Sequence, residues 1–125
     1  MKSDNNGKYF FGNVKDNLVE NGWFFGHFMK NPLLHSSDVE VAWQDISNKN
    51  AEKSDLHTHK VAVEINILIS GLVKLKINGE NISANQPGDC WVVWPDAVVE
   101  KVEAGEHTTI ICIKAPSISG DKYYL

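Results

Sequence analysis

The sequence predicts an all-β protein, built as a sandwich or a barrel. Short runs of β-branched and aromatic residues recur from residue 39 to residue 114, and glycine, proline and asparagine separate them at short intervals. Almost no segment places apolar residues at the spacing of an amphipathic helix. Many short strands with closely spaced turns are typical of sandwiches and barrels. At 125 residues the chain is long enough for one domain and too short for two.

The sequence divides into residues 1–36, which we predict to form an aromatic-rich arm, and residues 37–125, which we predict to form the barrel. Within the arm, Tyr9–Phe11 and Gly22–Met29 are aromatic runs bounded by glycine and asparagine, a pattern typical of strands. So much aromatic surface must be covered. We therefore expect the arm to pack on the barrel or on a partner subunit.

The barrel segment alternates strands and turns. Val39, Val41 and Trp43 fall on one face of a half-buried strand. Asn78-Gly79 joins the next clear pair of strands and is a strong type I′ hairpin signal. Further strands are expected in the run that ends at Gly71 and over residues 72–77, 80–84, 90–94, 97–103 and 107–114.

The candidate site lies in the segment that precedes Gly71. His57 and His59 are two residues apart, so on a strand their imidazoles point to the same face. Glu64 has the opposite parity, and on one straight strand its carboxylate would point away from them. The three side chains can meet only if the chain bends or reverses between His59 and Glu64. We predict that it does.

Two imidazoles and one carboxylate on one side of a pocket form the 2-His-1-carboxylate set that holds Fe(II) with open positions. Zinc, manganese, nickel or copper could use the same ligands. The alternative is a pair of surface histidines beside a solvated glutamate, and the residues alone leave both interpretations open.

The spacing His-x-His-x(4)-Glu-x(6)-Gly, met by His57, His59, Glu64 and Gly71, resembles the first sequence motif of the cupin superfamily. The motif's usual leading glycine falls at Ala51, which is a departure. A second run similar to the other cupin motif follows at Gly79, Pro87-Gly88-Asp89 and Pro95. The resemblance is to small single-domain cupins and implies a jelly-roll barrel, a double-stranded β-helix.

The resemblance also implies a metal held by His57, His59 and Glu64, but the fourth cupin ligand, a histidine, is missing. Counting from Pro95 puts its place at Glu100, and counting from Gly88 puts it near Val99. Glu100 is therefore a candidate fourth ligand. It could equally be a solvated side chain in a run of glutamates.

The strand that carries Glu64 has two different faces. Asn66 shares the face of Glu64 and is a candidate contact for a small molecule, or a residue that orients a metal ligand. The opposite face carries Ile65, Ile67 and Ile69 and is continuously apolar. Because such a face is usually buried against a copy of the chain, we predict a homodimer.

Two functions from different classes follow from these patterns. The first is a cupin with a divalent transition metal (Fe, Mn, Zn or Ni) that acts on a small molecule as a dioxygenase, isomerase or lyase, the reaction unassigned. The second is a non-catalytic cupin that binds a small ligand, such as a carbohydrate, with an incomplete metal site. Fold alone does not choose between them.

Composition argues against several other classes. The formal net charge is −4 and the pI is near 5.7, so no nucleic-acid partner is expected. No apolar run is long enough for a signal peptide or a membrane span, and we predict a cytoplasmic protein without membrane contact. Cys90 and Cys112 lie in apolar runs and are predicted to be small buried hydrophobes.

Overall fold

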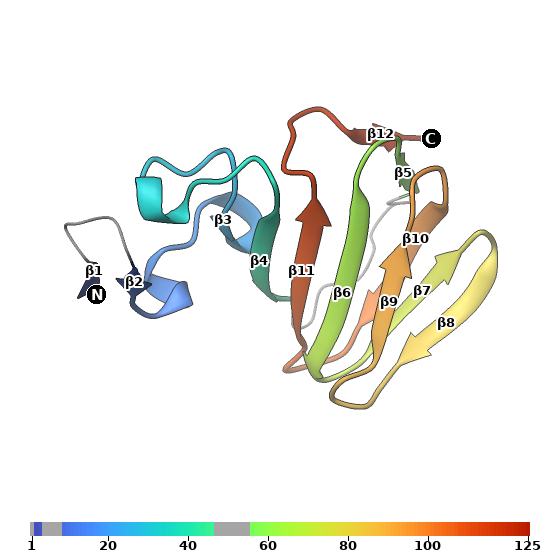
Figure 1. The fold of residues 1–125 in the computed structure, drawn as a ribbon. Helices are drawn as coiled ribbons and strands as arrows, with labels where there is room; N and C mark the ends of the chain where they lie inside the picture. The colour runs from blue at the N-terminus through green and yellow to red at the C-terminus, as the bar shows by residue number, and fades with distance from the viewer. Residues whose placement is uncertain (1, 4–8, 47–55) are drawn as a thin grey trace.

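A computed structural model shows two antiparallel sheets of five strands each, with a small two-stranded sheet in the N-terminal arm (Figure 1). The structure describes residues 2–3, 9–46 and 56–125. Ala51, where the leading glycine of the first motif would stand, lies outside the described residues. The predicted all-β barrel is confirmed.

The first sheet has the order β3 (Trp23–Phe25), β4 (Glu40–Asp45), β11 (Thr109–Ala115), β6 (Val63–Ser70) and β9 (Cys90–Val93). The second has the order β12 (Lys122–Tyr124), β5 (His57–His59), β10 (Val98–Ala104), β7 (Val73–Ile77) and β8 (Glu80–Ala84). From β4 onward the chain alternates between the two sheets, except at the β7–β8 hairpin. The chain crosses from one sheet to the other between β5 and β6, which is the crossing that the candidate site requires.

The hydrophobic core lies between the two sheets because each strand turns alternate residues inward. On β6 the inward residues Asn66 and Leu68 are 3% and 0% exposed, whereas Ile69 on the opposite face is 38% exposed. The core cluster also draws on β7, β9, β10 and β11, and its buried members are Ile46, Leu68, Val73, Leu75, Ala84, Trp91, Val93, Val99, Ala104 and Ile110.

Two turns require glycine, one because of its positive φ and the other also because of a close contact between chain segments. Asn78 and Gly79 join β7 to β8 with φ values of +51° and +82°, so the predicted type I′ hairpin is confirmed. Gly71 follows β6 with φ at +89°, and a Cβ atom there would come within 2.6 Å of the Cα of Thr108. Only glycine allows this close approach of the two chain segments.

The N-terminal arm contributes one strand to the barrel. Strand β3 pairs with β4, but the aromatic run leaves strand geometry at Gly26, where φ is +150°. The arm also holds β1 (Lys2–Ser3), which pairs with β2 (Phe10–Phe11), and the short 3-10 helices η1 (Val14–Asp16), η2 (Glu20–Gly22) and η3 (Pro32–Leu34). None of the helices in the described segments is long and apolar enough to cross a membrane.

The two cysteines lie in different environments. Cys112 on β11 is buried, as predicted, and is 4% exposed. Cys90 on β9 is exposed, so the prediction of its burial was wrong. The reason is the alternation of β9, which turns Trp91 and Val93 into the core and leaves Cys90 on the outer face.

Candidate functional site

The chain reverses between His59 and Glu64, as the parity of the three residues requires. Strand β5 ends at His59 in one sheet, and β6 begins at Val63 in the other. As a result His57, His59 and Glu64 form a group whose ligand atoms all lie within 4.8 Å of one another. The two imidazole rings meet edge to face, with their centroids 5.3 Å apart.

His59 is held so that one ring nitrogen faces the carboxylate of Glu64. Its Nδ1 lies 3.0 Å from the backbone carbonyl oxygen of Asp121, and its Nε2 lies 3.0 Å from Oε2 of Glu64. A carbonyl oxygen only accepts hydrogen bonds, so Nδ1 carries a hydrogen and donates. In the neutral ring Nε2 then presents a lone pair to a carboxylate. That arrangement needs a proton or a cation between the two atoms.

The donor set therefore fits a metal ion. His59 is 3% exposed, and its Nε2 is a buried nitrogen with no hydrogen-bond partner among the described residues. Ligating histidines commonly donate their other ring N–H to a backbone carbonyl, which fixes the tautomer and the ring orientation, and Asp121 provides this contact here.

Glu64 is a strong acid in this environment. Burial alone would raise the pKa of Glu64, but a proton on Nε2 of His59 that is donated to Glu64, the charge of Lys114 and the hydrogen bond from Asn66 outweigh it and lower that pKa to about 2. The amide of Asn66 donates to Oε1 at 3.0 Å, and the ammonium group of Lys114 lies 3.9 Å from Oε2. A carboxylate with so low a pKa is ionised near neutral pH and is a weak base, which suits a ligand better than a general base.

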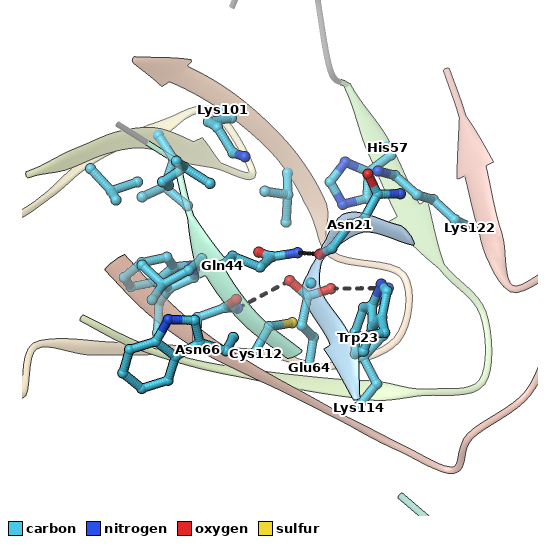
Figure 2. A pocket seen from close by; sticks show the side chains of 18 of the residues that line it. Asn21, Trp23, Gln44, His57, Glu64, Asn66, Lys101, Cys112, Lys114 and Lys122 are labelled. Carbon is cyan, nitrogen blue, oxygen red and sulfur yellow. Dashed lines mark hydrogen bonds and ion pairs between the residues drawn. The ribbon is translucent and has the colours of Figure 1, made fainter. Parts of the chain in front are cut away.

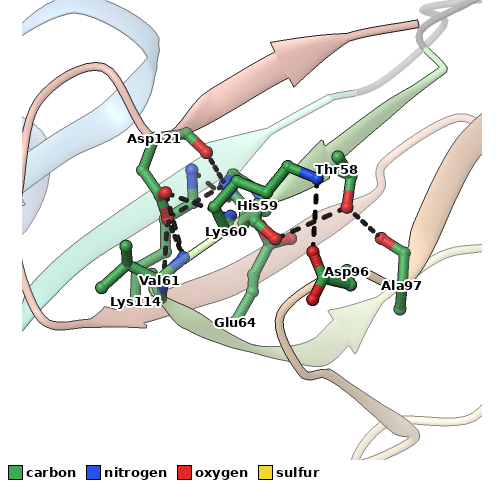
Figure 3. A network of polar contacts seen from close by, with 10 residues as sticks. Thr58, His59, Lys60, Val61, Glu64, Asp96, Ala97, Lys114 and Asp121 are labelled. Carbon is green, nitrogen blue, oxygen red and sulfur yellow. Dashed lines mark hydrogen bonds and ion pairs between the residues drawn. The ribbon is translucent and has the colours of Figure 1, made fainter.

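Asp121 hydrogen-bonds to the turn between β5 and β6 and holds it in place (Figure 3). Its carboxylate accepts hydrogen bonds from the backbone N–H groups of Lys60, Val61 and Ala62 at 2.9–3.1 Å. Burial alone would raise the pKa of Asp121, but these three hydrogen bonds lower it. The sequence analysis did not find Asp121, because no local pattern connects it with a turn about sixty residues earlier.

His57 and Glu64 line a cavity of about 640 Å³ between the sheets (Figure 2), whereas His59 lines a smaller one of about 210 Å³ beside Asp121. The larger volume lies within the usual range of small-molecule sites. Asn66 lines the larger cavity, and its side-chain amide donates a hydrogen bond to Glu64. Other lining residues that the sequence analysis did not select are Trp23, Gln44, Trp91, Lys101, Cys112, Lys114, Lys122 and Tyr124.

Glu100 does not join the group. On β10 it pairs with Lys76, whereas Val99 pairs with His57 and lines the cavity. Of the two ways of counting the place of the fourth ligand, the count from Gly88 gives the inward position of β10. That position holds the apolar side chain of Val99. Glu100 as a fourth ligand stays a prediction. The described residues offer His57, His59 and Glu64 alone.

Comparison with known proteins identifies the fold. No protein-family model matches the chain, and neither does any curated protein sequence. Solved structures do match. Pac13 of Streptomyces, described as a nucleoside dehydratase, is 12% identical with a TM-score of 0.64, over 94% of this chain and 92% of that one. A protein from Planctomyces limnophilus is 18% identical with a TM-score of 0.66, over 94% and 97%.

Two further structures cover less of the chain. A cupin protein from Bacteroides fragilis is 25% identical with a TM-score of 0.51, over 70% of this chain and 74% of that one. KdgF from Halomonas is 19% identical with a TM-score of 0.59, over 68% and 74%. Together with the sheet order, these matches define a small single-domain protein with the cupin-type barrel. In this barrel His57 and Glu64, two members of the cluster of two histidines and a glutamate, line a cavity between the sheets.

Proposed function

We propose that this protein binds a divalent transition metal through His57, His59 and Glu64 and acts on a small molecule in the adjoining cavity. The observation that carries the proposal is the buried Nε2 of His59, whose lone pair faces an ionised carboxylate at 3.0 Å. A cation between these atoms relieves their repulsion.

The surroundings of the three residues favour a metal over a bare ion pair. Asp121 fixes the tautomer of His59, and Asn66 holds the carboxylate of Glu64, so both ligands are oriented by a second layer of contacts. Two imidazoles and one carboxylate suit Fe, Mn, Zn or Ni. A metal bound there would supply a Lewis acid with open coordination positions. A dioxygenase, an isomerase and a lyase all remain candidate reactions.

Elemental analysis of protein purified without chelator tests the metal site. We expect about one equivalent of metal, and a rise in melting temperature when metal is returned to chelator-treated protein. His59→Ala and His57→Ala should lose the metal. The matched control is His35→Ala, since His35 is exposed and contacts only the carbonyl oxygen of Met29 among the described residues. Wild-type protein that holds no metal and gains no stability from any of the four ions would contradict the proposal.

A second function is a binding protein without turnover, for example for a carbohydrate. The apolar Val99 at the inward position of β10 favours it, because the metal group then has three protein ligands instead of four. Ligand screening by thermal shift, followed by mass spectrometry of each hit after incubation, separates the two functions. Uridine belongs in the screen because solved structures of Pac13 contain it. A hit that is chemically changed supports the enzyme, and a hit recovered intact supports the binding protein.

We also propose that two copies associate through the outer face of the first sheet. There Ile65 pairs across the strands with Val92 and Ile113, and Val92 is 45% exposed. This apolar surface continues along β6 to Ile69. Sedimentation over a wide concentration range should show a dimer that Ile65→Lys dissociates. The control Ile118→Lys changes an exposed isoleucine outside that sheet. A monomer at every concentration would reject the proposal.

A further inference from the structure

We propose that Lys101 binds the anionic group of the small molecule, so that the ligand of this cavity is a carboxylate or a phosphate ester. The proposal rests on the proposed function to the extent that a small molecule occupies the cavity. It adds the ligand's chemical class and the residue that selects it.

Lys101 reaches the cavity from the sheet opposite Glu64. It lies on β10, two residues after the inward-facing Val99, and it pairs across the strands with Leu75, which is 3% exposed. Figure 2 shows its side chain across the cavity from Asn66 and Cys112. Val99, Leu75 and Ile110 line the same cavity, so its neighbours there include several apolar side chains.

A β-bulge turns Glu103 away from the face of β10 that carries Lys101. Strict alternation would place Lys101 and Glu103 on one face of β10, but the pairing register shifts between them. Lys101 pairs with the inward Leu75 in the register of Val99 with Ile77. Beyond the shift, Glu103 pairs with Lys74 and forms an ion pair with it at 3.3 Å on the outer face. Bulges are frequent beside functional sites, where they redirect a side chain. Here the bulge separates a lysine from the acid that would otherwise share its face.

Lys101 also differs from the other lysines of the cavity. Lys114 lies 3.9 Å from Glu64 and over the ring of Trp23, and Lys122 lies over the ring of Tyr124. Among the described residues the side chain of Lys101 has neither an ion pair nor a hydrogen bond. A partly buried cation among apolar side chains is costly without a counter-charge. A bound anion would provide that charge.

The charge of the lining agrees with an anionic ligand. Three lysines line the cavity, Lys101, Lys114 and Lys122, against two carboxylates, Asp45 and Glu64. The chain as a whole carries a net charge of −4. The cavity is thus more cationic than the molecule around it, which attracts anions into it. A lysine binds carboxylate and phosphate groups as a point charge and does not select between them by geometry.

Paired ligands that differ in one anionic group test this proposal. Glucuronate and glucose form one pair, and uridine monophosphate and uridine form the other. Each is titrated calorimetrically, up to about 10 mM, into metal-loaded and chelator-treated protein. Lys101→Gln removes the charge, and Lys101→Arg restores it. Lys74→Gln is the matched control, because Lys74 lies on the adjacent strand with its ammonium group on the outer face.

We expect at least one anionic probe to bind more tightly than its neutral partner. Lys101→Gln should weaken the binding of that anionic probe by about tenfold or more and leave the affinity for its neutral partner nearly unchanged. Lys74→Gln should change neither affinity much. Lys101→Arg should recover most of the affinity.

Three results would overturn the proposal: no anionic probe binds, each pair binds equally, or Lys101→Gln weakens both members of a pair alike. An anion that binds only in metal-loaded protein and ignores Lys101 is a metal ligand, which leaves the metal site standing and removes the role of Lys101. Conversely, Lys101-dependent binding to a protein that takes up no metal refutes the metal site alone.

Discussion

Asp121 offers the sharpest test of how the site is built. It stands directly before β12, and its side chain hydrogen-bonds to the turn between β5 and β6. Asp121→Ala removes the acceptor of three backbone N–H groups. Ala62 is 2% exposed, so its N–H would be left buried without a partner, at a cost of about 1–3 kcal/mol. Lys60 and Val61 are exposed, so water can replace part of the loss at their N–H groups.

We therefore expect Asp121→Ala to lower the free energy of unfolding by about 2–4 kcal/mol, and Asp121→Asn, which keeps one oxygen acceptor, by about 1–2 kcal/mol. Urea unfolding measures both. Asp96→Asn is the control, because Asp96 also contacts Lys60, at 3.3 Å, but is 73% exposed. A surface pair of this kind is worth less than about 1 kcal/mol.

The pH dependence gives a second readout of the same contacts. The pKa of Asp121 is lowered in the folded protein, so its contribution is complete above the pKa of the unfolded chain, about 4, and is lost as pH falls through the folded value. The wild-type protein should thus lose part of its advantage over Asp121→Asn on acidification to about pH 3. Asp121→Ala with unchanged stability, or Asp96→Asn with an equal loss, would refute the reasoning.

Three further predictions concern the core and the turns. Gly71→Ala should destabilise the protein by more than about 2 kcal/mol in thermal or urea unfolding, because its Cβ atom would overlap Thr108. Gly79→Ala should cost about 1–2 kcal/mol, because φ is also positive at Gly79 but the space around it is open. Equal losses of stability in the two variants would contradict this reasoning. Leu68→Ala, at a core position that is 0% exposed, should lower the free energy of unfolding by about 3–5 kcal/mol, and a loss below 1 kcal/mol would mean that the site collapses around the smaller side chain. A thiol reagent should label Cys90 quickly and Cys112 only after unfolding, because burial both shields the Cys112 thiol and raises its pKa. Rapid labelling of both cysteines in the native protein would show that the reagent reaches Cys112 through the cavity.

Local spacing was enough to predict the cluster of His57, His59 and Glu64 and several turns. His57, His59 and Glu64 are near neighbours in sequence, so their parity alone required a chain reversal, and the structure contains it. Asn78-Gly79 specifies its own turn type, because both residues must adopt positive φ. Predictions of this kind depend on a few adjacent residues and on no distant partner.

Other features depend on pairing across the barrel and could not be predicted in the same way. Whether Val99 or Glu100 faces the histidines depends on the register of β10 against β5, which differs by one residue between the two ways of counting. The outward direction of Glu103, away from Lys101, depends on a bulge that has no clear signal in its own sequence. Asp121 reaches its turn only because β12 pairs with β5.

Strand β5 has only three residues, and its two neighbours, β10 and β12, come from much later in the chain. Neither β5 nor β12 supplies a buried member of the core cluster. Although all three residues of β5 are buried, we therefore expect β5 and β12 to separate from the barrel at a smaller free-energy cost than global unfolding. Such local opening would expose both imidazoles to solvent and give an incoming ion a route to them that leaves the interior of the barrel undisturbed.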